Sequence, residues 1–197
     1  MLGSRRTKVI VTFAAVVILG YVVVWFTQGK GGVPQDFVDA RMQGAIIAQN
    51  IVNLSNQSMV SLEQVNTLDQ KQDYANALTL TTGLVAQSQQ IRDQAVELSA
   101  QVGQMTKALS EISDFNARQA ALESISNRLA LINQLINYSA DLGKLLDVLR
   151  NRFTGQGGTN VEVQALVNQI NTDVNAINNF NSQAGQAMDR FDAIVGK

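Results

Sequence analysis

Hydrophobic residues recur with the period of an α-helix through most of this chain. The helical pattern covers four segments, at residues 36–68, 73–112, 115–153 and 161–195. Short polar or glycine-rich stretches separate them, and no alternation of apolar and polar residues typical of a strand occurs. We therefore expect an all-α protein.

In two of these segments, every seventh position carries an apolar residue. The repeat in the second segment consists of Leu84, Ile91, Leu98, Met105 and Ile112, and the repeat in the last consists of Val163, Ile170, Ile177, Ala184 and Phe191. A sustained heptad keeps one helix face on its neighbours only if the helices supercoil. Short connections make consecutive helices antiparallel. The pattern predicts an antiparallel up-down-up-down four-helix bundle with coiled-coil-like packing.

The other two segments carry broader apolar faces. In the third, one row of apolar residues shifts around the helix midway along its length. The row consists first of Leu122, Leu129 and Ile136 and then of Leu135, Leu142 and Leu149. We expect both sets to face the core, with a slight rotation of the apolar face between them. The first segment spreads its apolar residues from Ile46 to Leu68 around a wide arc, which predicts contact with two neighbouring helices.

The start of the last segment is the best specified boundary. A glycine-rich stretch at residues 155–158 ends the preceding helix, and Thr159 is followed three residues later by Glu162. This spacing has the form of a capping box, in which each side chain satisfies a free backbone amide.

The N-terminal part differs from the rest, because residues 9–26 form an uninterrupted run of 18 uncharged, mostly apolar residues. As a helix this run spans about 27 Å, close to the hydrocarbon core of a bilayer. Arg5, Arg6 and Lys8 precede it, and positive residues favour the cytoplasmic side. A cleaved signal peptide is the alternative, since Thr27 and Gly29 are small residues suited to a cleavage site.

These features predict four parts along the chain. Residues 1–8 are expected to be cytoplasmic, residues 9–28 to be a single transmembrane anchor in the cell membrane, and residues 29–35 to be a flexible tether. Residues 36–197 are then expected to form the four-helix bundle on the outer side, which is periplasmic or extracellular.

Composition excludes several kinds of chemistry. The chain has no His and no Cys, so the usual zinc, haem and iron–sulfur ligands are missing, together with triads built on either residue. We expect no catalytic residue, metal or cofactor, and hence no enzyme. Residues 28–197 carry 12 Lys and Arg against 16 Asp and Glu, without a basic stripe, and we expect no binding to nucleic acid.

A few polar residues fall where apolar ones are expected. Antiparallel pairing of the second and third helices places Ser88 beside Ser139, and pairing of the first two brings Ser55 to the same height. Asn181 takes a core-register position one or two turns away. This candidate polar layer can be read as small spacers and a register-setting amide. The alternative is a pocket for a small ligand.

In outline, an N-terminal anchor carrying an exported helical bundle resembles the LemA-type envelope proteins and the sensor modules of bacterial chemoreceptors. The resemblance is one of architecture. The leading hypothesis for such an anchored, outward-facing bundle is an envelope protein that acts as a scaffold or adaptor, with a protein partner or a second copy bound through the helical faces. The competing hypothesis is a sensor-like, ligand-binding bundle that uses the polar layer.

Overall fold

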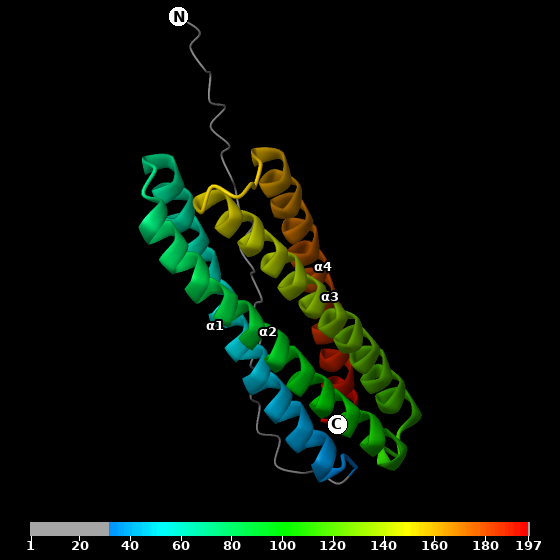
Figure 1. Ribbon diagram of the computed structural model, residues 1–197. Coiled ribbons are helices and arrows are strands. Elements are labelled where there is room, and N and C mark those ends of the chain that lie inside the picture. Colours follow the sequence, from blue (N-terminus) through cyan, green and yellow to red (C-terminus); the bar gives the residue numbers. More distant parts are fainter. Residues whose placement is uncertain (1–31, 197) are drawn as a thin grey trace, which may run out of the picture.

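The computed structural model describes residues 32–196 of the chain, and these residues are all-helical, as predicted (Figure 1). Four long helices make up the described part: α1 (Gln35–Lys71), α2 (Tyr74–Ala108), α3 (Phe115–Phe153) and α4 (Asn160–Val195). A single turn of 3₁₀-helix, η1 (Leu109–Glu111), follows α2. The four segments expected from the apolar periodicity correspond one by one to these helices.

The predicted membrane anchor, residues 9–28, lies outside the described residues. Within residues 32–196, none of the helices is long and apolar enough to cross a membrane.

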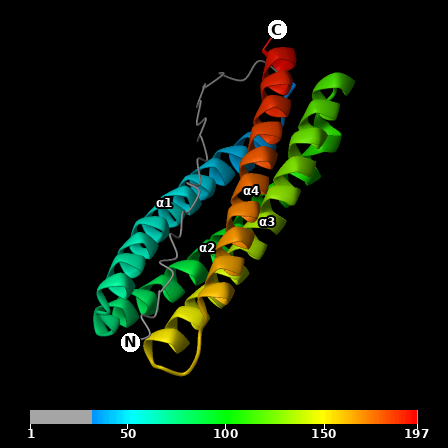
Figure 2. The same ribbon diagram turned by 90° about the horizontal axis from the view of Figure 1, so that it is seen from above.

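Consecutive helices run in opposite directions, so the described residues are arranged as a four-helix bundle (Figure 1). Extensive interfaces join α1 to α2, α2 to α3 and α3 to α4. Helices α1 and α4 meet mainly at one end, where the rings of Phe37 and Phe191 are 5.2 Å apart, and they diverge toward the other end (Figure 2). At that other end Arg152 of α3 binds Asp69 of α1, with 2.9 Å between Nη2 and Oδ2.

The connections between helices follow from local chemistry. Gln72 ends α1 in the left-handed conformation, with φ of 62°. The Asp114 carboxylate accepts a hydrogen bond of 2.8 Å from the Ala117 amide and so begins α3. The capping box predicted for α4 is confirmed, because Thr159 Oγ1 accepts from the Glu162 amide while the Glu162 carboxylate accepts from the Thr159 amide.

Both predicted heptads face the interior. The five residues of the α2 repeat are at most 2% exposed, and the five residues of the α4 repeat are at most 7% exposed. All of them except Ala184 join one continuous apolar core that also includes Ile51 of α1 and Leu142 of α3. Burial of large aliphatic side chains is the main source of stability in such a bundle.

One expectation about α3 was wrong. Leu135, Leu142 and Leu149 are buried as expected, but Leu122 is 53% exposed and Leu129 is 43% exposed. Leu122 and Leu129 point away from the core because α3 packs extensively only on α2 and α4, and these two helices cover one side of α3.

The broad apolar face expected for α1 is also only partly buried. Ile46 and Val60 are about half exposed. Helix α1 packs along α2 but approaches α4 mainly near Phe37, so part of its apolar arc is left uncovered.

Candidate functional site

The centre of the bundle contains a hydrogen bond between the two serines expected to lie together. Ser88 on α2 and Ser139 on α3 are both buried, and Ser88 Oγ donates to the backbone carbonyl of Ser139 over 2.8 Å. The hydroxyl of Ser139 turns back to the Ile136 carbonyl of its own helix at 2.9 Å. Both hydroxyls therefore serve helix packing, and neither is left to act as a donor toward a ligand.

The third serine of the predicted layer has a different environment. Ser55 on α1 is 1% exposed, and within the described residues its hydroxyl makes no hydrogen bond of standard geometry. It faces the phenol of Tyr138 on α3, which is also buried. Burial raises the pKa of Tyr138 to about 12, and the nearby Ser55 hydroxyl opposes that rise. Tyr138 thus remains a neutral phenol at physiological pH.

Asn181 does not belong to this layer. The hydroxyl of Ser124 on α3 donates to the Ala184 carbonyl of α4 at 2.9 Å, and this bond sets the register of the two helices. Asn181 then lies level with residue 127, about three helical turns from Ser139. Its side chain is only half-buried. The prediction of one or two turns was wrong, because the glycine-rich connection before α4 leaves the register of that helix on α3 open, and the Ser124–Ala184 bond determines it.

Two neighbouring carboxylates between α3 and α4 were not predicted from the sequence. Asp173 is 4% exposed, and the Asp141 side chain beside it is 13% exposed. Gln169 Nε2 donates to Asp173 Oδ1 over 3.2 Å, whereas Oδ2 has no hydrogen-bond partner among the described residues. Burial raises the pKa of Asp173, and the negative charge of Asp141 raises it further. Lys144 lies 2.6 Å from Asp141 and offsets part of this charge.

Arg128 of α3 also carries its charge in a buried environment. In the described part of the chain its Nε is buried without a hydrogen-bond partner, and Arg41 of α1 is near enough to disfavour its charge. Burial, followed by this repulsion, lowers the pKa of Arg128 to about 10. Arg41 itself holds Asp192 of α4 with two hydrogen bonds of 2.6 and 2.7 Å. Arg128 therefore stays charged at neutral pH at an energetic cost to the fold.

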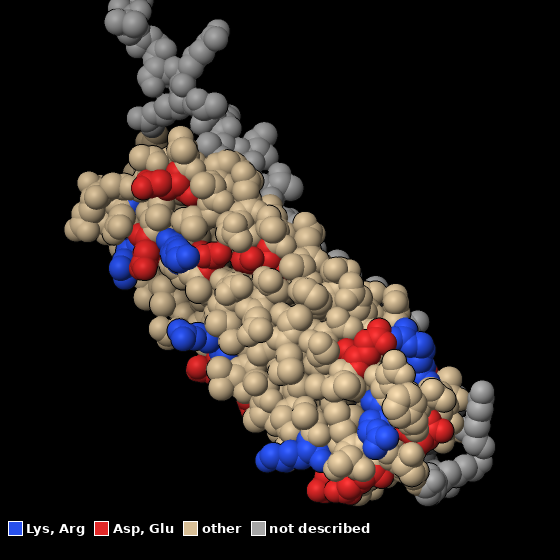
Figure 3. Space-filling view, turned by 90° about the vertical axis from the view of Figure 1, so that its right-hand side faces the viewer, with Lys and Arg blue, Asp and Glu red and all other residues tan. Residues whose placement is uncertain are grey.

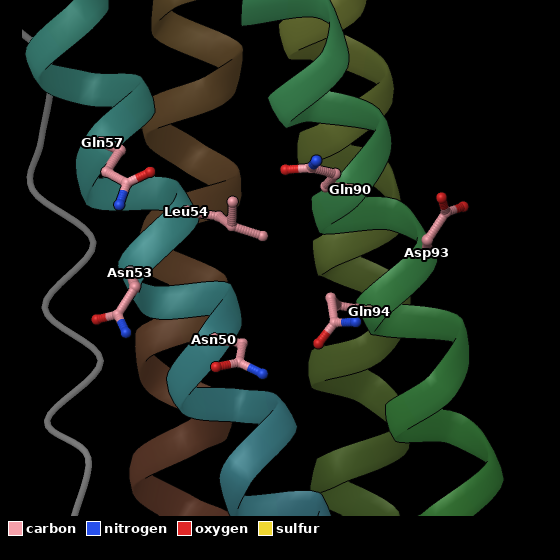
Figure 4. Close-up of a pocket in the computed structure, with 7 residues that line it drawn as sticks. All are labelled: Asn50, Asn53, Leu54, Gln57, Gln90, Asp93 and Gln94. Atoms are coloured by element: carbon pink, nitrogen blue, oxygen red, sulfur yellow. The ribbon is translucent and has the colours of Figure 1, made fainter.

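The hollow of the surface shown in Figure 4 is a shallow groove between α1 and α2. Its volume is about 510 Å³. Five of its seven lining side chains are amides, namely Asn50, Asn53, Gln57, Gln90 and Gln94, and the other two are Leu54 and Asp93. Such side chains both donate and accept hydrogen bonds. The groove lies between α1 and α2, whereas the Ser88–Ser139 bond lies between α2 and α3.

Charged side chains are unevenly placed on the bundle. On the face shown in Figure 3, Lys, Arg, Asp and Glu gather toward the two ends, and the middle is largely uncharged. Among residues 32–196, no three Asp or Glu side chains come close enough to hold a metal ion.

The described residues define an all-helical bundle protein with an apolar core that contains a few buried polar side chains. Comparison with protein-family models, with curated proteins and with solved structures found no match to this chain.

Proposed function

We propose that this protein is a membrane-anchored scaffold or adaptor of a bacterial-type cell envelope, with its bundle on the outer side and no catalytic role. The observation that carries the proposal is the continuous apolar core. It extends from the Phe37–Phe191 contact at one end of the bundle to Phe153 at the other, where the partly exposed ring of Tyr74 stacks on Phe153. A long, closely packed rod presents surface to partners rather than an interior to substrates.

The anchor in this proposal is supported by sequence alone. The run at residues 9–26 has the length of a membrane-spanning helix, and Arg5, Arg6 and Lys8 precede it. These positive residues favour a cytoplasmic N-terminus, so that the bundle lies outside, in the periplasm or the extracellular space.

The alternative is a ligand-binding, sensor-like bundle, and one observation favours it. Ser55 and Tyr138 place two hydroxyls side by side in the core, and among the described residues the Ser55 hydroxyl has no hydrogen bond of standard geometry. A small polar ligand that entered the core beside Ser55 would supply a hydrogen bond to that hydroxyl. In this case Ser55→Ala should abolish any ligand-induced rise in melting temperature, whereas Ser61→Ala on the same helix should retain it.

The decisive experiment for the scaffold proposal is the topology of the chain. A C-terminal tag should be degraded when protease is added to spheroplasts, while a cytoplasmic marker stays intact. A tag that is protected until the membrane is lysed would place the bundle inside and overturn the proposal. A tag that is released into the soluble periplasmic fraction would instead indicate the cleaved signal peptide.

A further inference from the structure

The outward face of α3 carries an apolar row that nothing else in the described residues covers. Phe115 is 67% exposed, Leu122 is 53% exposed and Leu129 is 43% exposed, and Ile136 continues the row half-buried. We call these four residues the α3 stripe. They recur at intervals of seven residues, which is the spacing of a coiled-coil seam.

The positions beside the α3 stripe complete the pattern of such a seam. Four residues after each member comes an exposed, uncharged residue: Gln119, Ser126, Asn133 and Ala140. In addition, residues 129–140 contain no charged side chain at all. If the stripe is assigned to the d positions of a heptad, these small and polar residues occupy the a positions. A seam of this composition gives modest affinity and a defined register.

We propose that the α3 stripe is a self-association surface, on which a second copy of this chain packs its own α3 in parallel and in register. In this arrangement each member of the stripe meets its own equivalent across a two-fold axis. Asn133 meets Asn133, and a pair of amides at an a position is a known device for fixing the register of a parallel dimer.

Charge complementarity supports a second copy as the occupant. In a parallel pair, the residue at a g position faces the e position five residues later on the other helix. With the stripe at d, Arg118 is at g and Glu123 is at e. Each copy would thus direct Arg118 at Glu123 of the other, twice in the dimer. An antiparallel pairing centred on the stripe would place Glu123 opposite Ala130, without such a contact.

The partner of Glu123 within the chain does not prevent this contact. Glu123 binds Arg190 of α4 through Oε2, and its side chain remains 54% exposed. A carboxylate can accept hydrogen bonds at both oxygens and can therefore bind two guanidinium groups. The parallel orientation also agrees with two copies held in one membrane, a point that rests on the proposed function.

The absence of native cysteine makes a direct test possible. Leu122→Cys and Leu129→Cys would be made separately in the full chain, purified in detergent and exposed to a mild oxidant. Identical d positions of a parallel pair are close enough for a disulfide. Both variants should form covalent dimers several-fold faster than Val96→Cys, a control on α2 whose parent side chain is 58% exposed.

Two outcomes would overturn the proposal. Cross-linking of both stripe variants at the rate of the Val96→Cys control would show that copies do not meet at α3. Rapid cross-linking of only one of the two would indicate an antiparallel or shifted contact. Because the assay needs only purified protein, its failure is independent of the protease result that tests the proposed function.

The charge pair has its own test, using Leu129→Cys as the reporter. Adding Arg118→Glu should slow disulfide formation, because it opposes two carboxylates, and adding Glu123→Arg as well should restore the rate. Equal rates in all three backgrounds would contradict the assigned pairing. Circular dichroism of each variant should match wild type, because Arg118 is only half-buried, Glu123 is 54% exposed and neither belongs to the apolar core.

Discussion

Buried hydroxyl groups in this core differ in the hydrogen bonds that they make. Those of Ser88 and Ser124 donate across an interface to a carbonyl of the neighbouring helix, at 2.8 and 2.9 Å. Such bonds join the helices at fixed heights and leave no polar atom unsatisfied. The hydroxyl of Ser55 is buried beside Tyr138 and has no standard hydrogen bond in the described part of the chain. The same residue type thus has opposite consequences at two positions.

This difference predicts different costs for the same substitution. Ser88→Ala should lower the free energy of unfolding by about 1 kcal/mol, because it removes one interhelical hydrogen bond from the core. Ser55→Ala should be neutral or stabilising, since it removes a buried hydroxyl that gains no such bond. Urea denaturation of the two variants beside wild type measures both. An equal loss in the two variants would indicate that both serines act only through their size.

The buried carboxylate of Asp173 predicts a pH dependence. Because burial and Asp141 raise its pKa, the folded chain holds the proton more tightly than the unfolded chain does. Stability from this group is therefore greatest at acid pH and falls as pH rises through the raised pKa. Asp173→Asn should remove this dependence and stabilise the protein at pH 7 by about 1 kcal/mol, since the new amide can donate to Asp141.

The measurement for Asp173 is the difference in unfolding free energy between variant and wild type across pH 4 to 8. Asp147→Asn is the control, because that aspartate lies on the neighbouring helix α3, which also carries Asp141, and its side chain is 62% exposed. A difference that stays constant with pH, or that matches the control, would contradict the assignment.

At the scale of the helices, the sequence predicts those features that depend on residues close together in the chain. The extents of α3 and α4 follow from periodicity, and the start of α4 follows from Thr159 and Glu162, which interact within one turn. Exposure of Leu122 does not follow, because it has the same heptad spacing as the buried Leu142. Spacing identifies a seam, and only the placement of α2 and α4 decides which seam is covered.

The same distinction applies to the polar residues of the core, since the places of some follow from the sequence and those of others do not. The pairing of Ser88 with Ser139 follows from a tight turn, since a short connection leaves little freedom in register. Asn181 was misplaced because a longer, glycine-rich connection precedes its helix. Asp173 was missed because a charged residue at the edge of a seam is expected to reach solvent, and here the side chain is enclosed.

The connection between α3 and α4 supports a prediction about glycine. Gly155 and Gly158 both have positive φ, of 72° and 83°. A Cβ at Gly155 would meet open space, whereas at Gly158 it would overlap the Val148 carbonyl oxygen. Gly155→Ala should therefore cost only the left-handed strain, about 1–2 kcal/mol. Gly158→Ala should cost more, and thermal denaturation of the pair should rank them in that order.

The whole bundle is asymmetric in how its helices are joined. Three successive interfaces run along the rod, while α1 and α4 close the bundle at one end through Phe37, Phe191 and the Arg41–Asp192 pair. At the opposite end α1 is joined to α3 by the Asp69–Arg152 pair. Each helix is thus tied at both ends to others of the same chain, and the core needs no second chain to close it.

A fragment beginning at Val33 should accordingly fold on its own. Its ellipticity and its melting temperature should be independent of concentration through the low micromolar range, because the heptads of α2 and α4 are buried within one chain. The α3 stripe should add association only at higher concentration, which sedimentation equilibrium can measure. If helix content instead fell on dilution, the seams would have to be completed by another copy, and the single-chain bundle would be wrong.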